Sequence, residues 1–344
     1  MKKTLLLGMI VCLLAPHPAQ AIDFFKKKPP PPVVESAKPA EDAKEKPAHQ
    51  KKKSPAVRMD NFKPFRGPAI GEMKEYTTKY EDTLVQLSRD NNIGFVEMRA
   101  ANPDVDPWLP GAGVNIILPT MYILPDAPRR GIVINLPEMR LYYYGKPEMP
   151  PISHPLGIGR EGLSTPMGTT TIVSKIENPV WRPTDRMRKE DPKLPASVPP
   201  GPDNPLGTHA MYLGWSEYRI HGTNKPFGIG RRSSSGCIRM YPEDIITLYP
   251  EVPVGTPVTV INQPVKAAWI GTDFYIEAHP TIEQSNSIEE NGGMPAYELS
   301  DDDMREILKA AGMDTQYLDW AKIRDVIRVR NGYPVIVGKR PQQT

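Results

Sequence analysis

The sequence predicts a mostly-β protein in which a central β-sandwich with one main helix follows a small βααβ unit and precedes a small α/β extension. The chain has 41 prolines among 344 residues, and an interior proline breaks a helix because it removes a donor and clashes with the preceding turn. Several central segments are rich in β-branched residues, as strands are. Apolar residues make up 39% of the chain, and beyond the N-terminal segment no run approaches the ~18–20 apolar residues of a membrane span.

The first 21 residues have the composition of a secretory signal peptide. Two lysines precede an apolar run from Leu5 to Leu14, and Ala19-Gln20-Ala21 follows it. A charged start, an apolar middle and an A-x-A site are the parts of a cleaved export signal, which is favoured over a retained anchor. Cleavage would remove Cys12 and leave Cys237 as the only cysteine, so the mature chain is expected to have no internal disulfide.

Residues 22–70 are predicted to be a disordered linker. The stretch up to residue 69 holds 12 Lys/Arg against 6 Asp/Glu and includes four consecutive prolines. It has too few apolar residues to offset the entropy of ordering, and a proline-rich chain is extended and semi-rigid. A spacer is favoured over a basic arm for anionic lipid or polymer. The net charge of +3 arises in these N-terminal segments, so the folded part has no electrostatic motive to bind nucleic acid.

Residues 76–119 are predicted to form a compact β-α-α-β unit. The segment 76–80 suits a strand, and Thr83 can cap a helix that carries Leu84 and Leu87. A second helix carries two further apolar residues, ends at Ala101-Asn102-Pro103, and leads to a strand at 114–119.

This unit resembles a LysM module, which binds polymers that contain N-acetylglucosamine. The resemblance is carried by Tyr76, Asp82-Thr83-Leu84, Ala101-Asn102-Pro103 and the strand from Gly113 to Pro119. It implies either glycan binding or a structural use of the same fold.

Residues 131–262 are predicted to be the main domain. One helix is expected from Pro242 to Tyr249, with proline in its first turn. Residues 182–206 are rich in proline and charge and show no period, which is typical of a lid or binding loop. The predicted strands are 131–136 and 139–144, joined by a turn at Pro137-Glu138, and 168–174, 209–213, 218–221 and 256–261.

Residues 263–344 are predicted to be an accessory subdomain that serves as a cap or partner surface, without chemistry of its own. A hairpin is expected around Gly271, and a helix is expected from Ser300 to a stop near Gly312. A second helix over 315–329 and a last strand over 333–337 complete this part.

The segment from Ile220 to Met240 combines His221 at the end of a strand with Cys237, sixteen residues later. A thiolate attacks whereas a thiol does not, so a catalytic cysteine needs a base, and His221 can serve as that base. Taken singly, a buried cysteine and a histidine that caps a loop are common structural features. A metal site is not expected, because no spaced third and fourth ligands accompany the pair.

Small and basic residues surround the cysteine. Ser234, Ser235 and Gly236 would let a substrate carbonyl approach, and their backbone amides can face an oxyanion. Arg239 lies two residues beyond the cysteine and can hold a carboxylate in a bidentate grip, which suits a peptide substrate that bears carboxylates.

The pattern His221-Gly222, a loop, then Ser234-Ser235-Gly236-Cys237-Ile238-Arg239 resembles the signature of the L,D-transpeptidases, the YkuD-domain family. The likeness is greatest to the periplasmic Gram-negative branch. One departure is Ser235, which stands where the family commonly has histidine. Further matching segments are 157–162, 165–168, 178–181 and 200–207.

The resemblance implies two-step acyl transfer on a peptidoglycan tetrapeptide stem. Cys237 would attack the carbonyl of the third residue, His221 would carry the proton to the leaving D-alanine, and the carbonyl of Gly222 would orient the imidazole. The thioester would then pass to an amine of a second stem or to a lysine of an outer-membrane lipoprotein. The resemblance also implies a periplasmic location, no metal or organic cofactor, and acylation of the thiol by carbapenems.

Two other functional classes stay open at the sequence level. A thiol hydrolase on the same domain would trim stems or release wall proteins, with water as acceptor. A non-catalytic protein would use the LysM-like unit and an inactive domain to bind peptidoglycan. A sortase-like enzyme also uses Cys, His and Arg, but the close spacing of His221 and Cys237 and the glycine-cysteine pair disfavour it.

Overall fold

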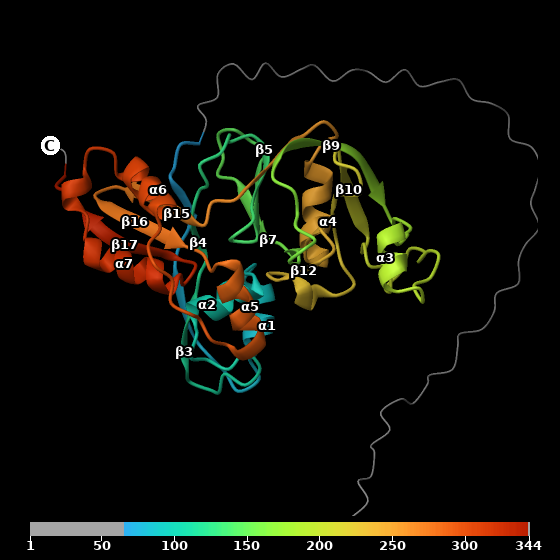
Figure 1. Ribbon diagram of the computed structural model, residues 1–344, viewed down its shortest axis with the longest axis horizontal. Coiled ribbons are helices and arrows are strands. Elements are labelled where there is room, and N and C mark those ends of the chain that lie inside the picture. Colours follow the sequence, from blue (N-terminus) through green and yellow to red (C-terminus); the bar gives the residue numbers. More distant parts are fainter. Residues whose placement is uncertain (1–64, 343–344) are drawn as a thin grey trace, which may run out of the picture. The chain divides into compact units, whose positions relative to one another are not determined.

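The computed structural model describes residues 65–342 (Figure 1). The predicted signal peptide and most of the predicted linker therefore lie outside the described residues. The chain divides into two units at residue 58, and all described residues belong to the second. None of the helices in this described part has the length and hydrophobicity needed to cross a bilayer.

The predicted mostly-β fold is confirmed by an eight-stranded sheet in the central domain, with strand order β13-β11-β10-β9-β14-β5-β6-β7. The strands are β5 (Gly131–Asn135), β6 (Arg140–Tyr144), β7 (Ile152–Pro155), β9 (Gly168–Glu177), β10 (His209–Leu213), β11 (Arg219–His221), β13 (Ile238–Arg239) and β14 (Pro257–Ile261). A separate parallel pair joins β8 (Ile158–Gly159) to β12 (Arg232–Ser234).

The two layers of the predicted sandwich are halves of one continuous sheet that curls. The first part of β9, 168–171, pairs with β14, and its second part, 172–177, pairs with β10. Beyond β7, Gly157 forms a bridge with Arg239 of β13, so the two edges of the sheet approach each other. The inner faces share one apolar core with helix α4 (Pro242–Glu251).

The N-terminal module has the order β2 (Lys74–Thr77), α1 (Leu84–Asp90), α2 (Phe95–Ala101) and β3 (Asn115–Leu118), and β2 pairs with β3. Thr83 caps α1, because its hydroxyl accepts a hydrogen bond from the Gln86 N–H at 3.0 Å. All seven residues of α2 are buried. The helix therefore packs against other parts of the molecule on every side.

The module is joined to the central domain by a buried ion pair. Arg140 of β6 is fully buried, and its Nη2 lies 2.9 Å from Oε2 of Glu97 on α2. The same carboxylate oxygen accepts the N–H of Gly94 at 3.0 Å. Removal of one member of a buried pair leaves an uncompensated charge, so this contact fixes where α2 lies.

The C-terminal extension is a three-stranded sheet with helices and its own apolar core. Figure 1 shows it as the orange and red end of the chain. Its elements are β15 (Val265–Ile270), β16 (Asp273–Ala278), α5 (Ile282–Asn291), α6 (Asp301–Ala311), α7 (Trp320–Val329) and β17 (Pro334–Lys339).

Several boundaries differ from the sequence predictions: the strand expected over 76–80 lies at Lys74–Thr77, and β9 and α4 extend past the predicted ends. Two further differences concern the linker and the last helix. The linker was expected to reach residue 70, but Ala69–Gly71 form strand β1, which pairs with β4 (Met121–Ile123) through backbone hydrogen bonds that no side-chain pattern reveals. A single helix was expected over 315–329, but α7 begins only at Trp320. The Asp319 carboxylate caps it by accepting the N–H of Lys322 at 3.0 Å.

Candidate active site

Strand β11, Arg219-Ile220-His221, pairs in parallel with β13, Ile238-Arg239, which directly follows Cys237. Ile220 is the Cα partner of Ile238, and His221 is the partner of Arg239. Both isoleucines are fully buried in the core. Side chains alternate between the faces of a strand, so the other four side chains share the opposite face. In this register Arg219 lies beside Cys237, and His221 lies diagonal to it.

These four side chains line one cavity of about 160 Å³. The remaining wall comes from the segment between β8 and β9, from the loop after β9, and from the segments before β11 and β13. The other lining residues are Leu163, Trp181, Arg182, Thr184, Arg186, Met187, Pro205, Leu206, Glu217, Tyr218, Ser234 and Ser235. The structure thus brings His221, Cys237, Arg239 and both serines together around one space.

His221 has the tautomer that a general base requires. Its Nδ1 lies 2.6 Å from the carbonyl oxygen of Gly222. Because a carbonyl only accepts, Nδ1 donates its hydrogen and the lone pair lies on Nε2. Burial, followed by the positive charges of Arg239 and Arg219, lowers the pKa of His221 to about 3. The ring is therefore neutral at physiological pH.

The thiol of Cys237 is also neutral in this structure. Burial raises its pKa, although Arg219 and Arg239 act in the opposite direction. Sγ donates to the backbone carbonyl of Glu217 over 3.4 Å. The resting pair is therefore a thiol and an imidazole rather than a thiolate and an imidazolium, and the proton has to move when substrate is bound.

Ser234 and Gly236 hold the loop in front of the cysteine. The Ser234 hydroxyl donates to the carbonyl of Cys237 at 2.5 Å and accepts the N–H of Gly236 at 3.1 Å. The buried Thr165 donates its hydroxyl hydrogen to the Gly236 carbonyl at 2.9 Å. Gly236 has φ +107°, a left-handed backbone that favours glycine.

The amide of Gly236 is therefore used inside the loop. Within residues 65–342, the N–H groups of Ser235 and Cys237 donate to no backbone carbonyl of a turn, loop or helix cap. These two amides remain available for a developing oxyanion. Ser235 itself lines the cavity beside these amides.

The predicted loop over 182–206 forms one wall of the cavity. It contains a short helix that the sequence did not predict, α3 (Asp185–Glu190), capped by the Thr184 hydroxyl. The fully buried Asn204 stabilises the loop, because its side-chain amide donates to three backbone carbonyls. These are the carbonyls of Pro179, Val198 and Pro199. Asn204 thereby fixes the shape of a segment that has little regular structure.

The loop that leads to the cysteine is anchored on the N-terminal module. The N–H groups of Phe95 and Val96, at the start of α2, donate to the carbonyls of Ile229 and Gly230 at 3.4 and 3.1 Å. The Arg231 guanidinium carbon lies 3.5 Å from the centroid of the Phe95 ring. The module therefore supports the segment between His221 and Cys237.

Substitution of Gly230 with alanine tests this anchor. Gly230 has φ +73°, and a Cβ there would lie 2.0 Å from the backbone N of Phe95. We expect Gly230→Ala to lower the free energy of unfolding by about 1–2 kcal/mol because of the left-handed backbone, and by about 1–3 kcal/mol more because of overpacking. Acylation of Cys237 should fall with stability. The checks are denaturant unfolding and the acylation rate.

Gly113→Ala is the matched control for Gly230→Ala. Gly113 has φ +79° with no atom within 4 Å of its added Cβ. It carries the backbone cost without the clash. Equal losses in the two variants would contradict the anchoring role of Gly230.

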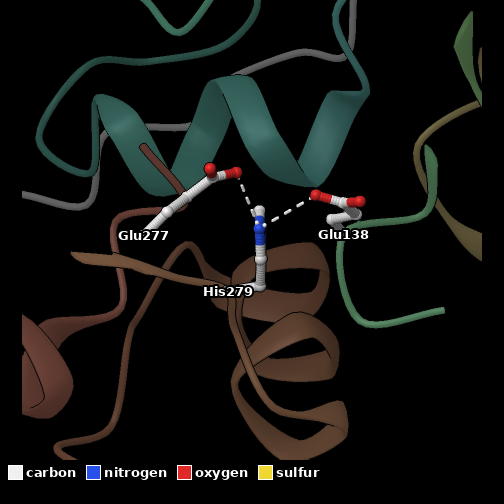
Figure 2. Close-up of side chains that lie close together, drawn as sticks. All are labelled: Glu138, Glu277 and His279. Carbon is white, nitrogen blue, oxygen red and sulfur yellow. Dashed lines mark ion pairs between the residues drawn. The ribbon is translucent and has the colours of Figure 1, made fainter. Parts of the chain in front are cut away.

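A second titratable cluster lies where the extension meets the central domain (Figure 2). Figure 2 shows Glu138, Glu277 and His279 pointing toward one another, and His279 Nε2 lies 3.2 and 2.9 Å from the two carboxylates. Three such ligands can suit a metal ion. Here the Lys266 ammonium already pairs with both carboxylates, at 2.9 Å from Glu277.

The charges of this cluster stabilise one another. Burial alone would raise the pKa of Glu138, but Lys266 and His279 outweigh burial and lower it. Burial would lower the pKa values of Lys266 and His279, but the carboxylates raise both. The basic and acidic groups thus favour one another's charged forms in the interior. The cluster acts as an ion-pair junction, and the lysine occupies the space that a cation would need.

Sequence reasoning missed several residues of the cavity. Arg219 stands two positions before His221 on the same strand. Side chains two residues apart on a strand share a face, so this spacing could have predicted that Arg219 lies beside His221. Arg182 and Arg186, on the loop after β9, carried no such signal because that loop has no period. Glu217, which adopts φ +69°, enters the cavity wall through a turn.

Comparison with known proteins gives a consistent result. The YkuD model, described as the L,D-transpeptidase catalytic domain, matches residues 129–260. The protein named probable L,D-transpeptidase YcfS of Escherichia coli is 39% identical over 278 residues, which cover 78% of this chain and 84% of that protein. Probable L,D-transpeptidase ErfK/SrfK of Salmonella typhimurium is 41% identical over 249 residues, covering 70% and 78%.

Among solved structures, the catalytic domain of the Enterococcus faecium L,D-transpeptidase is 24% identical to this chain. The match covers 40% of this chain and 100% of that domain, with a TM-score of 0.32. A likeness at this level adds nothing to the sequence matches.

Proposed function

The chain belongs to the YkuD-domain L,D-transpeptidase family, and on that premise we propose that Cys237 and His221 carry out its acyl transfer on peptidoglycan stem peptides. The observation that supports these two roles is the pairing of β11 with β13, which brings His221 and the adjoining Cys237 into the wall of one cavity. The chain is thus an enzyme, with a cysteine nucleophile as the proposed reactive group.

In the first step, Sγ of Cys237 passes its proton to Nε2 of His221 and bonds to the carbonyl carbon of the third stem residue. The N–H groups of Ser235 and Cys237 stabilise the oxyanion. The carbon–nitrogen bond to D-alanine then breaks, and His221 returns the proton to the leaving amine. The Gly222 carbonyl holds the ring in the required tautomer throughout.

In the second step, an amine attacks the thioester and releases the thiol. A second stem gives a 3–3 crosslink, and a lysine of an outer-membrane lipoprotein gives an attached protein. His221 can accept the proton of the incoming amine by the reverse of its first action. Arg239 is proposed to hold a carboxylate of the donor, and Ser234 and Gly236 to position the loop.

We further propose a periplasmic location and contact with the glycan. The location is supported by the export signal in the sequence and by relatives from Escherichia coli and Salmonella typhimurium. Contact with glycan is supported by the βααβ order of the N-terminal module. It is also supported by two aromatic side chains exposed on that module, Tyr80 and Trp108.

Product analysis tests the proposed function. The wild-type protein and Cys237→Ala are incubated with a disaccharide-tetrapeptide, and D-alanine and muropeptides are quantified by mass spectrometry. We expect D-alanine and a crosslinked dimer from the wild type only. D-alanine with tripeptide as the sole product would indicate a hydrolase. No turnover, with peptidoglycan still bound by both forms, would indicate a non-catalytic binding protein.

A further inference from the structure

Two half-buried guanidinium groups beside Cys237 in the cavity have no anionic partner. Arg219 and Arg239 both line the cavity that holds Cys237, and neither forms an ion pair with a carboxylate of residues 65–342. The Nε atoms of both are buried without a hydrogen-bond partner in this part of the chain. Both arginines are half-buried, and a charge partly removed from water is costly unless it is paired, so two such groups at one site favour an anionic ligand.

The other charged groups of the wall are already occupied or face solvent. Arg186 pairs with Glu190, with Nη1 2.6 Å from Oε1. Arg182 lies on the exposed part of the loop. Arg219 donates from Nη2 to the backbone oxygen of Glu217 at 3.1 Å, not to its carboxylate. Of the unpaired arginines in the wall, Arg182 is exposed and only Arg219 and Arg239, on β11 and β13, are half-buried.

The register of the two strands places this charge near the thiol. Arg219 lies beside Cys237 across the strand pair, where neighbouring strands are about 4.8 Å apart. Arg239 lies two residues further along β13, on the same face. The Arg219 guanidinium lies near the sulfur, because both groups donate to the backbone carbonyl of Glu217. The charges of Arg219 and Arg239 reach both the thiol and the His221 ring.

We propose that Arg219 and Arg239 together bind the terminal carboxylate of the residue that leaves, which makes Arg219 a specificity-determining residue. This inference rests on the proposed function and adds a second arginine to it. One residue spans at most about 3.5 Å, so the carboxylate that ends the chain one residue after the attacked carbonyl must lie close to Sγ. Two forked guanidinium groups match a carboxylate in geometry and charge.

The proposal predicts how donors are discriminated. A donor that ends in a carboxylate directly after the scissile bond satisfies both arginines. A C-terminal amide, or a donor extended by one more residue, leaves two guanidinium groups without a counter-charge in a partly buried cavity. Such donors should acylate Cys237 more slowly, although the attacked bond is the same.

The test compares two donors on the full chain. The acylation rate is measured by intact mass for a disaccharide-tetrapeptide and for its C-terminal amide. We expect wild type to prefer the acid by about 10- to 100-fold and Arg219→Met to lose most of that preference, with Arg219→Lys retaining part of it. Arg219→Met also raises the thiol pKa, but this change affects both donors equally and cancels in the ratio.

Controls separate the possible failures. Arg324→Met removes a guanidinium from the exposed face of α7 and should keep the wild-type ratio. A third donor carries lysine instead of meso-diaminopimelate as its third stem residue. Lysine lacks the side-chain carboxylate that meso-diaminopimelate has. If the preference followed that carboxylate, or if wild type used acid and amide equally, the proposal would be wrong while the proposed function stood. If neither donor acylated wild type, the proposed function itself would fail.

Discussion

Exchange of His221 for glutamine is expected to slow the acylation of Cys237 by about 10²–10⁴-fold, the usual contribution of a positioned general base. Glutamine has a similar volume and can still donate to the Gly222 carbonyl, but it cannot accept a proton. Because the resting thiol is neutral, attack without this base requires a rare thiolate. The rate is measured by intact mass with a tetrapeptide donor.

The matched control for this variant is His209→Gln. The His209 ring lies against Tyr249, with centroids 4.6 Å apart, and does not line the cavity. His209→Gln should keep the acylation rate within about twofold of the wild-type rate, because substitutions away from such sites usually have small effects. A His221→Gln protein that acylates as fast as wild type, with an unchanged melting temperature, would remove His221 from the mechanism.

The pH dependence of acylation follows from the same environment. The pKa of His221 is lowered to about 3, so its neutral, proton-accepting form is present above that value and is lost only in strong acid. We expect the acylation rate to show no acid limb near the ordinary value of 6.5. A limb centred there would show that the ring is protonated in the normal range.

Replacement of Lys266 with methionine is expected to lower the free energy of unfolding by about 3–5 kcal/mol. The ammonium is 1% exposed and pairs with Glu138 and Glu277. Without it, two buried carboxylates face each other with only His279 between them. The check is the midpoint and slope of denaturant unfolding.

Lys309→Met is the matched control for this loss. Lys309 also pairs with an aspartate, Asp126, but both side chains are largely exposed. Surface pairs contribute about 0–1 kcal/mol, so this variant should unfold almost as wild type does. Equal stability of the Lys266 and Lys309 variants would show that the buried cluster does not hold the extension in place.

The cluster also gives stability a pH dependence with a defined sign. The folded pKa of His279 is raised, so its contribution is fully present below the ordinary value of 6.5 and is lost as pH rises through the folded value. The folded pKa of Glu138 is lowered, so its contribution is present above the ordinary value of 4.5 and is lost as pH falls through the folded value. Both contributions should be present together between those two ordinary values.

Local patterns in the sequence were enough for six of the central strands and for proposing the reactive pair, whereas β7, β8, β12 and β13 were not predicted. The hairpin of β5 and β6 follows from two apolar runs around a turn at Pro137-Glu138. The pair His221 and Cys237 follows from a strand end and a small-residue loop. These features depend on neighbours in the chain, and local patterns report such neighbours well.

Features that depend on distant contacts could not be predicted. Helix α5 has few apolar residues, and only Ile288 among its apolar side chains is buried in the shared core. Its place is set by contacts such as the pair between Glu289 and Arg231, 2.8 Å apart. That pair is 58 positions apart in the chain. The contact of α2 with the cysteine loop and the pair of Lys266 with Glu138 join residues more than a hundred positions apart.

The most direct test of the mechanism is the intact mass of the mature protein during reaction with a disaccharide-tetrapeptide. We predict a transient adduct whose mass equals the donor minus D-alanine, located on Cys237 by peptide mapping. The adduct should be absent in Cys237→Ala and strongly delayed in His221→Gln. Turnover without any adduct, or an adduct that persists in Cys237→Ala, would contradict acyl transfer through this cysteine.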